Sequence, residues 1–149
     1  DIGSHLLDLC LFWFGSKVKK LKITEINKFE NKAPDHAILS LEINKINIQL
    51  EMTLCMWKNT FTCDLLAAKG SVHLNSLCKW SKSTFIYRKR KFPSGKPSEK
   101  ITSFEQGDPT WRSEYLFFKD LIKKNKKNNL KRDVILNREF AKIKKYNFV

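Results

Sequence analysis

The chain has 149 residues and a mass of 17.5 kDa, the size of one ordinary domain. Hydrophobic residues make up 42% of it and charged residues 30%, which is typical of a globular protein with a core. The longest apolar stretch, residues 9–15, is far shorter than the roughly 20 residues of a membrane-spanning helix. Asp1 and Asp8 precede it, so it lacks the basic flank of a signal peptide. We therefore expect no transmembrane or secretory segment.

The five glycines are widely spaced, and no two lie closer than 12 residues. Dinucleotide-binding and Walker A loops need clustered glycines, so that the backbone can approach a phosphate. The chain therefore has no nucleotide-binding loop, and we expect it to contribute no cofactor-binding residues of its own.

The cysteines favour a reducing environment. Successive cysteines are separated by 45, 8 and 15 residues, and no C-x-x-C pair occurs. This spacing excludes the usual zinc and thioredoxin-like motifs, and we expect no metal site. Apolar residues surround each cysteine, which predicts buried free thiols in a cytoplasmic protein. The cysteines are Cys10, Cys55, Cys63 and Cys78.

The formal net charge is +14, and residues 119–149 alone carry +8. A basic segment of this kind can hold phosphate backbones or an acidic surface. However, Lys, Asn and Ile account for 47 of the 149 residues, as an AT-rich genome would produce, and there are only five arginines. Arginine dominates specific base contacts. We therefore interpret the charge as solvated surface and expect neither nucleic acid nor a membrane as a partner.

The chain begins with a predicted helix over residues 1–14, and Gly15 is suited to end it. Four polar residues fall within an arc of about 100° on this helix, and nearly all others are apolar. A surface helix has a wider polar face than this. We expect the polar stripe to face a cleft. Its members are Asp1, Ser4, His5 and Asp8.

After the helix the hydrophobic pattern changes to a period of two, which predicts strands. The short Asn44-Lys45 break predicts an antiparallel hairpin, and Lys69-Gly70 predicts a second turn. Two prolines and a glycine within residues 92–98 predict a loop. The predicted strands cover residues 18–29, 37–43, 46–56, 60–67, 71–77 and 83–91.

Helices return after Pro109, with Asp108 as the expected N-cap. One face of this helix carries Trp111, Tyr115, Phe118 and Ile122, and we expect the aromatic set Trp111, Tyr115, Phe117 and Phe118 to lie in the core. A last helix is predicted over residues 133–146, with Val134, Ile135, Phe140 and Ile143 on its buried side. The order predicts an α+β fold: a mostly antiparallel open sheet with helices packed on one face. We expect the other face to serve oligomerisation, because Cys55, Trp57 and Cys63 point to a covered surface.

The opening stretch Asp1-Ile2-Gly3-Ser4-His5-Leu6-Leu7-Asp8-Leu9, with the apolar run to Gly15, resembles the start of the C-terminal domain of the Gfo/Idh/MocA oxidoreductase family. That family includes glucose–fructose oxidoreductase and inositol dehydrogenase. Lys69-Gly70-Ser71, Asp108-Pro109-Thr110-Trp111 and Glu114-Tyr115 extend the resemblance over nearly the whole chain, although only the first motif is specific.

The resemblance implies that residues 1–149 are the substrate-binding and oligomerisation domain of a two-domain NAD(P)-dependent dehydrogenase. NAD or NADP would be bound mainly by an N-terminal Rossmann domain that this chain lacks, so the fragment by itself should be inactive. The substrate would be a sugar, polyol or nucleotide-sugar, and the enzyme would form a homodimer or homotetramer.

The family's acid/base pair is Asp-x-x-x-His, which Asp1 and His5 match. The resemblance implies that His5 takes a proton from a substrate hydroxyl while hydride leaves the same carbon. An imidazole suits this role because it exchanges protons near neutral pH. Asp1 would orient the ring or hold a neighbouring hydroxyl.

Other polar residues allow two interpretations each. Asp8 is either a substrate contact or a structural hydrogen-bond acceptor. Lys79, Trp80 and Arg88 could meet the phosphates of a nucleotide-sugar, or the basic run 88–90 could be an exposed strand edge that discourages aggregation. His36 and His73 are isolated and carry no expected chemistry. The alternative to the enzyme is a non-catalytic binding or regulatory module, whose basic region 119–145 holds an acidic partner.

Overall fold

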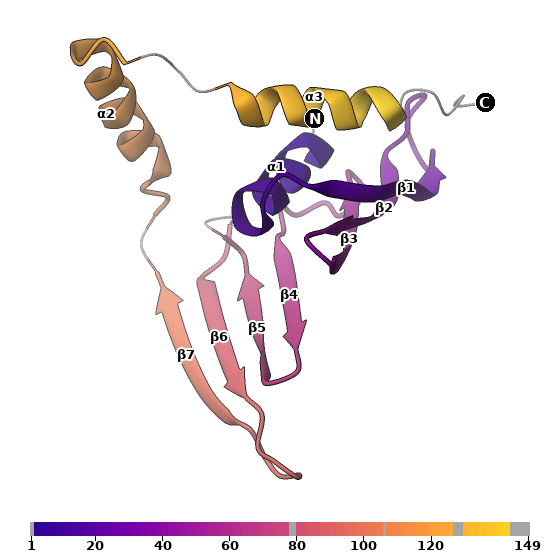
Figure 1. The fold of residues 1–149 in the computed structure, drawn as a ribbon, viewed down its shortest axis with the longest axis vertical. Helices are drawn as coiled ribbons and strands as arrows, with labels where there is room; N and C mark the ends of the chain where they lie inside the picture. The colour runs from indigo at the N-terminus through magenta and orange to yellow at the C-terminus, as the bar shows by residue number, and fades with distance from the viewer. Residues whose placement is uncertain (1, 78–79, 106, 127–129, 144–149) are drawn as a thin grey trace. The chain divides into compact units, whose positions relative to one another are not determined.

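The computed structural model describes residues 2–77, 80–105, 107–126 and 130–143. In these ranges the chain forms three helices and seven strands, and the strands make two antiparallel sheets (Figure 1). The predicted α+β class with antiparallel sheets is therefore confirmed. The single expected sheet is replaced by a sheet of three strands and a sheet of four. The chain divides into two compact units: unit 1 is Asp1–Cys55 with Lys127–Val149, and unit 2 is Met56–Lys126.

Unit 1 contains the three-stranded sheet, in the order β1-β2-β3. The β2–β3 hairpin turns at Asn44 and Lys45, whose φ angles of 49° and 68° match a two-residue turn of the type that hairpins favour. The register pairs Ile43 with Ile46 directly across this turn, so the predicted hairpin is confirmed. The elements of unit 1 are α1 (Ile2–Phe14), β1 (Val18–Asn27), β2 (His36–Ile43), β3 (Ile46–Thr53) and α3 (Lys131–Ile143).

Helix α1 ends at the predicted glycine. Gly15 has φ +91°, a left-handed conformation, and its N–H donates to the Leu11 carbonyl oxygen at 3.1 Å. The side-chain amide of Asn44 donates to the Phe14 carbonyl oxygen. A Cβ at Gly15 would lie 2.8 Å from that amide nitrogen. The β2–β3 turn therefore holds the end of α1, and both the space and the φ angle require glycine there.

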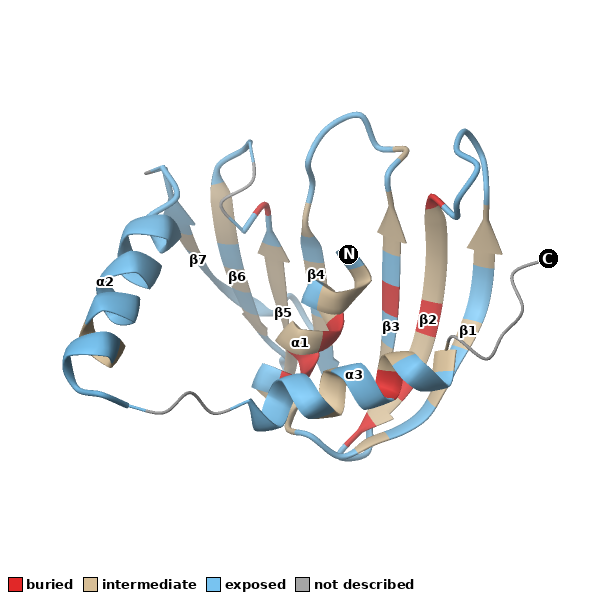
Figure 2. Ribbon diagram, turned by 90° about the horizontal axis from the view of Figure 1, so that it is seen from above, coloured by how far each residue is buried: buried red, intermediate tan, exposed pale blue. Residues whose placement is uncertain are grey.

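The core of unit 1 lies between α1 and one face of its sheet. Leu7, Cys10 and Leu11 follow the i, i+3, i+4 spacing that puts them on one side of α1. Figure 2 shows most of the buried residues gathered on α1, β2 and β3. Several partly buried residues of α3 pack against this core, namely Ile135, Leu136, Phe140 and Ile143. The buried strand residues are Leu39, Leu41, Ile43 and Leu50.

Helix α3 differs from its predicted form in two ways. Val134, which was expected on the buried side, is 65% exposed. Glu139 is buried instead, and its carboxylate accepts hydrogen bonds from Lys142 at 2.6 Å and from Arg138 at 3.2 Å. The two cations neutralise a carboxylate that would otherwise be costly to bury. Side-chain type alone predicts an exposed glutamate, and only the packed helix shows its pairing.

Unit 2 contains the four-stranded sheet in the order β4-β5-β6-β7. Strand β7 was not predicted, because it is mostly polar and exposed and lacks a regular apolar alternation. A Cβ at Gly70 would lie 2.1 Å from the Arg88 carbonyl oxygen, so only glycine lets β5 approach β6 so closely. The elements of unit 2 are β4 (Thr62–Ala67), β5 (Gly70–Asn75), β6 (Ser83–Lys89), β7 (Ser98–Phe104) and α2 (Thr110–Lys123).

Helix α2 begins where it was predicted, but it is not a core helix. The N-cap is Pro109 and not Asp108 as predicted, and no side chain caps the helix. The Asp108 carboxylate, one residue earlier, accepts the Thr110 backbone N–H at 2.9 Å. No described residue of α2 is buried, and Figure 2 shows it exposed along nearly its whole length. The prediction that its aromatic residues form core was therefore wrong. Their exposed fractions are 76% for Trp111, 61% for Tyr115, 64% for Phe117 and 57% for Phe118.

The cysteines are free thiols wherever the structure describes them. Cys10 is buried, whereas Cys55 and Cys63 are half-buried, and Cys78 lies outside the described residues. Burial raises the pKa of the Cys63 thiol, and the neighbouring Asp64 carboxylate raises it further. Cys63 is therefore held in its weakly nucleophilic thiol form.

Candidate functional site

The amino-terminal turn of α1 carries the predicted acid/base group. His5 is exposed, while Leu7, two residues further on, is completely buried. The packed side of α1 therefore holds the helix in place and leaves His5 on its open side. Asp1, the predicted partner of His5, lies outside the described residues. A side chain on a packed helix is positioned more accurately than one on a loop, which suits a group that must meet a substrate.

Asp8 connects α1 to α3. Its carboxylate forms an ion pair with Arg132, with 2.6 Å between Oδ1 and Nε. The Arg132 guanidinium also lies 5.5 Å from the centre of the Phe12 ring, which is one turn along α1 from Asp8. Of the two interpretations of Asp8, this geometry supports the structural one, because its carboxylate is already engaged within unit 1.

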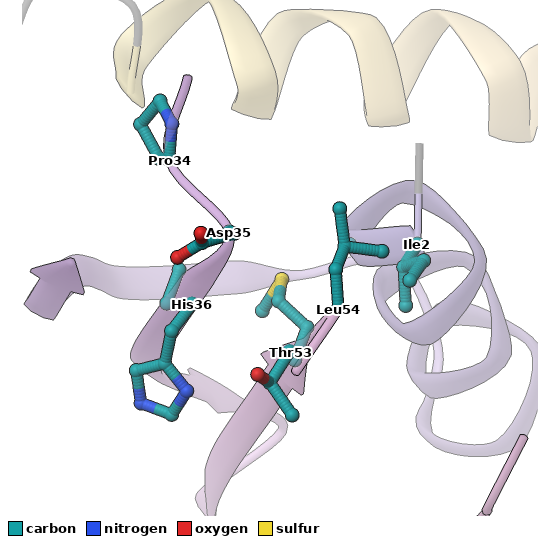
Figure 3. A pocket seen from close by; sticks show the side chains of 9 residues that line it. Ile2, Pro34, Asp35, His36, Thr53 and Leu54 are labelled. Atoms are coloured by element: carbon teal, nitrogen blue, oxygen red, sulfur yellow. The ribbon is translucent and has the colours of Figure 1, made fainter. Parts of the chain in front are cut away.

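A cavity of about 220 Å³ opens at the amino-terminal end of α1 (Figure 3). Ile2 belongs to its wall and precedes His5 by three residues, so the two share one side of the helix. His5 itself is not among the residues that line the cavity. Most of the lining is apolar. His36 and Thr53 also belong to it, but they pair across β2 and β3, and their side chains point to the opposite face of the sheet from Met52. The remaining lining residues are Gly3, Pro34, Asp35, Ala37, Met52 and Leu54.

Gly3 brings the first turn of α1 against the end of β3. A Cβ at this position would lie 2.8 Å from the Met52 sulfur. The flexible Met52 side chain would have to move for any larger residue to fit. Gly3 and Met52 therefore pack closely at the wall of the cavity.

Asp35, the residue just before β2, is also part of the cavity wall. It is only 3% exposed, and its carboxylate accepts backbone N–H groups of Phe29 at 2.9 Å, Glu30 at 2.8 Å and Asn31 at 2.9 Å. These hydrogen bonds hold its pKa far below the usual range. Its backbone oxygen also accepts the Leu54 N–H at 2.8 Å. An aspartate just before an apolar strand is a signal for such a loop-closing role.

Replacing Asp35 with asparagine is expected to lower the Tm at neutral pH, because a neutral amide binds three N–H groups less strongly than a carboxylate does. A carboxyl whose pKa is depressed by folding stabilises the fold above its ordinary pKa of 3.8, and that stabilisation is lost as the pH falls below this value. The wild-type Tm should therefore fall more steeply below pH 4 than that of Asp35→Asn. Thermal unfolding followed by circular dichroism at a series of pH values measures both effects.

The matched control for this experiment is Glu51→Gln, at an exposed position on β3. It removes one carboxylate that makes no comparable set of hydrogen bonds in the described structure. A Glu51→Gln curve that coincides with that of Asp35→Asn would show that general charge, and not the Asp35 loop, sets the acid sensitivity.

The other predicted substrate residues belong to unit 2. Lys79 lies outside the described residues. Trp80, 74% exposed, precedes β6, whereas Arg88 lies near the far end of that strand. The five residue steps from Ser83 to Arg88 alone span about 16 Å of extended chain. The structure therefore does not bring Trp80 and Arg88 together.

Arg88 belongs to a polar network that the sequence did not reveal. Its guanidinium pairs with Glu99 on β7 and donates to His73 Nε2 at 3.2 Å. Arginine has only donors, so Nε2 is an acceptor and the Nδ1–H of His73 donates to Asp64 at 2.6 Å. Ser71 Oγ lies 2.8 Å from the same Nε2. The network joins all four strands of the sheet. We therefore interpret it as a structural cross-link between the strands.

Within the described ranges, no group of His, Cys, Asp and Glu side chains is arranged to hold a metal ion. In the same residues, no helix combines the length and the apolar character needed to cross a membrane. The chain matches no protein-family model, no curated protein and no solved structure.

Proposed function

We propose that the chain is the substrate-side domain of an NAD(P)-dependent oxidoreductase of the Gfo/Idh/MocA family. Its substrate is a hydroxyl of a sugar, polyol or nucleotide-sugar, and His5 is the general acid/base with Asp1 as its partner. The observation that carries the proposal is the exposed His5 on the first turn of a packed helix, whose Ile2 and Gly3 line a cavity. The Asp-x-x-x-His motif that ends at His5 suggests that this chemistry is acid/base catalysis.

In the proposed reaction, His5 accepts the proton of the substrate hydroxyl as hydride departs from the same carbon. The nicotinamide cofactor, bound mainly by a separate Rossmann domain, supplies the hydride acceptor. The packed face of α1, centred on Leu7, keeps the imidazole in place during proton transfer. In the reverse direction the protonated imidazole returns its proton to the alkoxide oxygen.

The cavity beside α1 supports a role in holding the part of the substrate that does not react. Its apolar wall suits the C–H face of a sugar ring. We further propose that the domain works in a cytoplasmic homodimer or homotetramer that forms through a sheet face.

Titration calorimetry with NAD and NADP tests the proposal. It should be carried out on this chain alone and on the same chain in its full-length protein. We expect tight binding by the full-length protein and at most weak binding by the 149-residue chain. A screen of sugars and polyols for cofactor reduction follows from that result. Absence of cofactor binding in both proteins would contradict the proposal.

A further inference from the structure

The connection between β6 and β7 forms a strongly basic hollow, which we name the basic cradle. It encloses about 470 Å³. Four of its six lining residues are cations, and no carboxylate lines it. Lys89 and Ser98 form the last pair of the β6–β7 ladder, so they lie side by side at the mouth of the loop. The lining residues are Lys89, Arg90, Lys91, Lys96, Pro97 and Ser98.

The cations of the cradle are not neutralised by the protein. None of the four forms an ion pair with any residue that the structure describes. The nearest acidic residue in sequence, Glu99, is already paired with Arg88. Like charges held this close repel one another, and that repulsion is relieved when an anion binds between them.

Arg90 is held by its surroundings. Its backbone N–H donates to the Lys69 carbonyl oxygen at 2.9 Å. Its guanidinium lies 4.5 Å from the centre of the Phe92 ring and also reaches the Ala68 carbonyl oxygen at 3.4 Å. These contacts restrict Arg90 before any ligand arrives, so less entropy is lost on binding.

Lys91 is positioned by a glycine. Gly95 has φ +135°, and a Cβ there would lie 3.0 Å from Lys91 Cδ. The lysine stem therefore crosses the loop in the space that the missing side chain leaves. A larger residue at Gly95 would push the stem away and would also strain the backbone.

We propose that the basic cradle binds the pyrophosphate group of a nucleotide-sized molecule. Its volume falls within the range of about 300–1,000 Å³ that is usual for small-molecule sites. Lysine ammonium groups and an arginine fork are the groups that bind phosphate oxygens, and the Ser98 hydroxyl adds a donor. Phe92, 63% exposed, offers a face on which a nucleobase can stack. The site uses no residue of the proposed oxidoreductase mechanism, so the two proposals can fail separately.

A small molecule fits the cradle better than a nucleic-acid strand does. All the lining cations come from one short loop and its two flanking strand ends, which suits two adjacent phosphates. A strand needs a basic groove that continues over several nucleotides. The cradle therefore recognises the linked phosphates that nucleoside diphosphates and nucleotide-sugars share.

Titration calorimetry with inorganic pyrophosphate and with UDP, on the full chain, tests the proposal. The double variant Lys89→Gln/Lys96→Gln should weaken binding of both by about tenfold or more, as the loss of charge-assisted hydrogen bonds predicts. The control Lys58→Gln/Lys123→Gln removes the same charge from unit 2 outside the cradle, and should leave the affinity nearly unchanged. Equal weakening by the two double variants would overturn the proposal, because it would show a response to net charge alone.

Gly95→Ala provides a second test in which the net charge stays the same. It should weaken pyrophosphate binding, because the lysine stem loses its place, while the circular dichroism spectrum stays unchanged. Wild-type affinity in this variant would overturn the role of the loop geometry.

A single-stranded 20-mer oligonucleotide is the competing probe. Binding of the oligonucleotide, with no binding of pyrophosphate or UDP at millimolar concentration, would identify the cradle as part of a nucleic-acid surface and refute the small-molecule site. If UDP binds more tightly than pyrophosphate and Phe92→Ala abolishes the difference, the ligand is a nucleotide. Equal affinity for the two probes would limit the site to the pyrophosphate group.

Discussion

If the proposed function holds, replacing His5 with alanine is expected to lower kcat of the full-length protein by about 10²–10⁴-fold, the usual contribution of a general acid/base group. The Kd for the nicotinamide cofactor should change little, because the proposal assigns cofactor binding mainly to a separate Rossmann domain and not to His5. The fold should also persist, since His5 is exposed and outside the core of unit 1. Steady-state kinetics, cofactor titration and thermal unfolding of the same preparation measure the three quantities.

Two additions make the His5 experiment specific. Added imidazole should restore part of the activity of His5→Ala, because a free base can enter the space that the side chain left. The control is His73→Ala, which removes a histidine of the structural network in unit 2 and should retain most of the activity. Near-normal turnover by His5→Ala would remove His5 from the mechanism and leave the acid/base role unassigned.

Leu7→Ala is expected to reduce the free energy of unfolding by about 2–5 kcal/mol, the range for large-to-small changes in a packed core. Leu7 is 0% exposed and belongs to the cluster that joins α1 to β2 and β3. The loss includes the transfer free energy of the deleted carbons and the cavity that remains. Urea unfolding followed by circular dichroism at 222 nm gives the value by linear extrapolation.

The matched control is Leu66→Ala, the same chemical change at a residue that is 81% exposed on β4. Surface substitutions of this kind usually change stability by less than about 0.5 kcal/mol. A Leu7→Ala loss no larger than that of Leu66→Ala would show that α1 does not pack on the sheet in solution. The positioning of His5 would then lose its physical basis.

Much of the fold could be read from local patterns. The turn at Asn44 and Lys45 and the helix stop at Gly15 depend on the φ preferences of a few residues, so the sequence predicted both. Strand β7 escaped prediction because a polar, exposed edge strand has little alternation. Backbone pairing with β6 holds β7 in the sheet, and the pattern of the β7 side chains gives no sign of this pairing.

For helix α2, the sequence predicted the element correctly but its burial wrongly. Its aromatic face has a clear helical period, which predicted the helix correctly from about Thr110 onward. The same period suggested burial, yet the face is exposed in the structure. Periodicity identifies the apolar side of a helix but does not supply the surface that would cover it.

For the candidate site, too, the sequence and the structure contributed different information. The sequence motif is the basis for proposing His5, and the spacing within one helix put Asp8 on the same polar stripe. Only the structure showed that Asp8 pairs with Arg132, 124 residues away in the chain. In the same way, no local pattern revealed that Arg88 is tied to His73 and Glu99.

The sequence by itself determined the α+β class, the hairpin and the end of α1, because these depend on local propensity and side-chain chemistry. The tertiary structure alone decided which groups are already paired and which are available. Burial of Asp35 and Glu139, the close approach at Gly70 and the unpaired cations around Lys91 all depend on contacts between distant segments. Those contacts form only when the chain packs, since the hydrophobic effect that drives packing has no direction of its own and does not specify partners in advance.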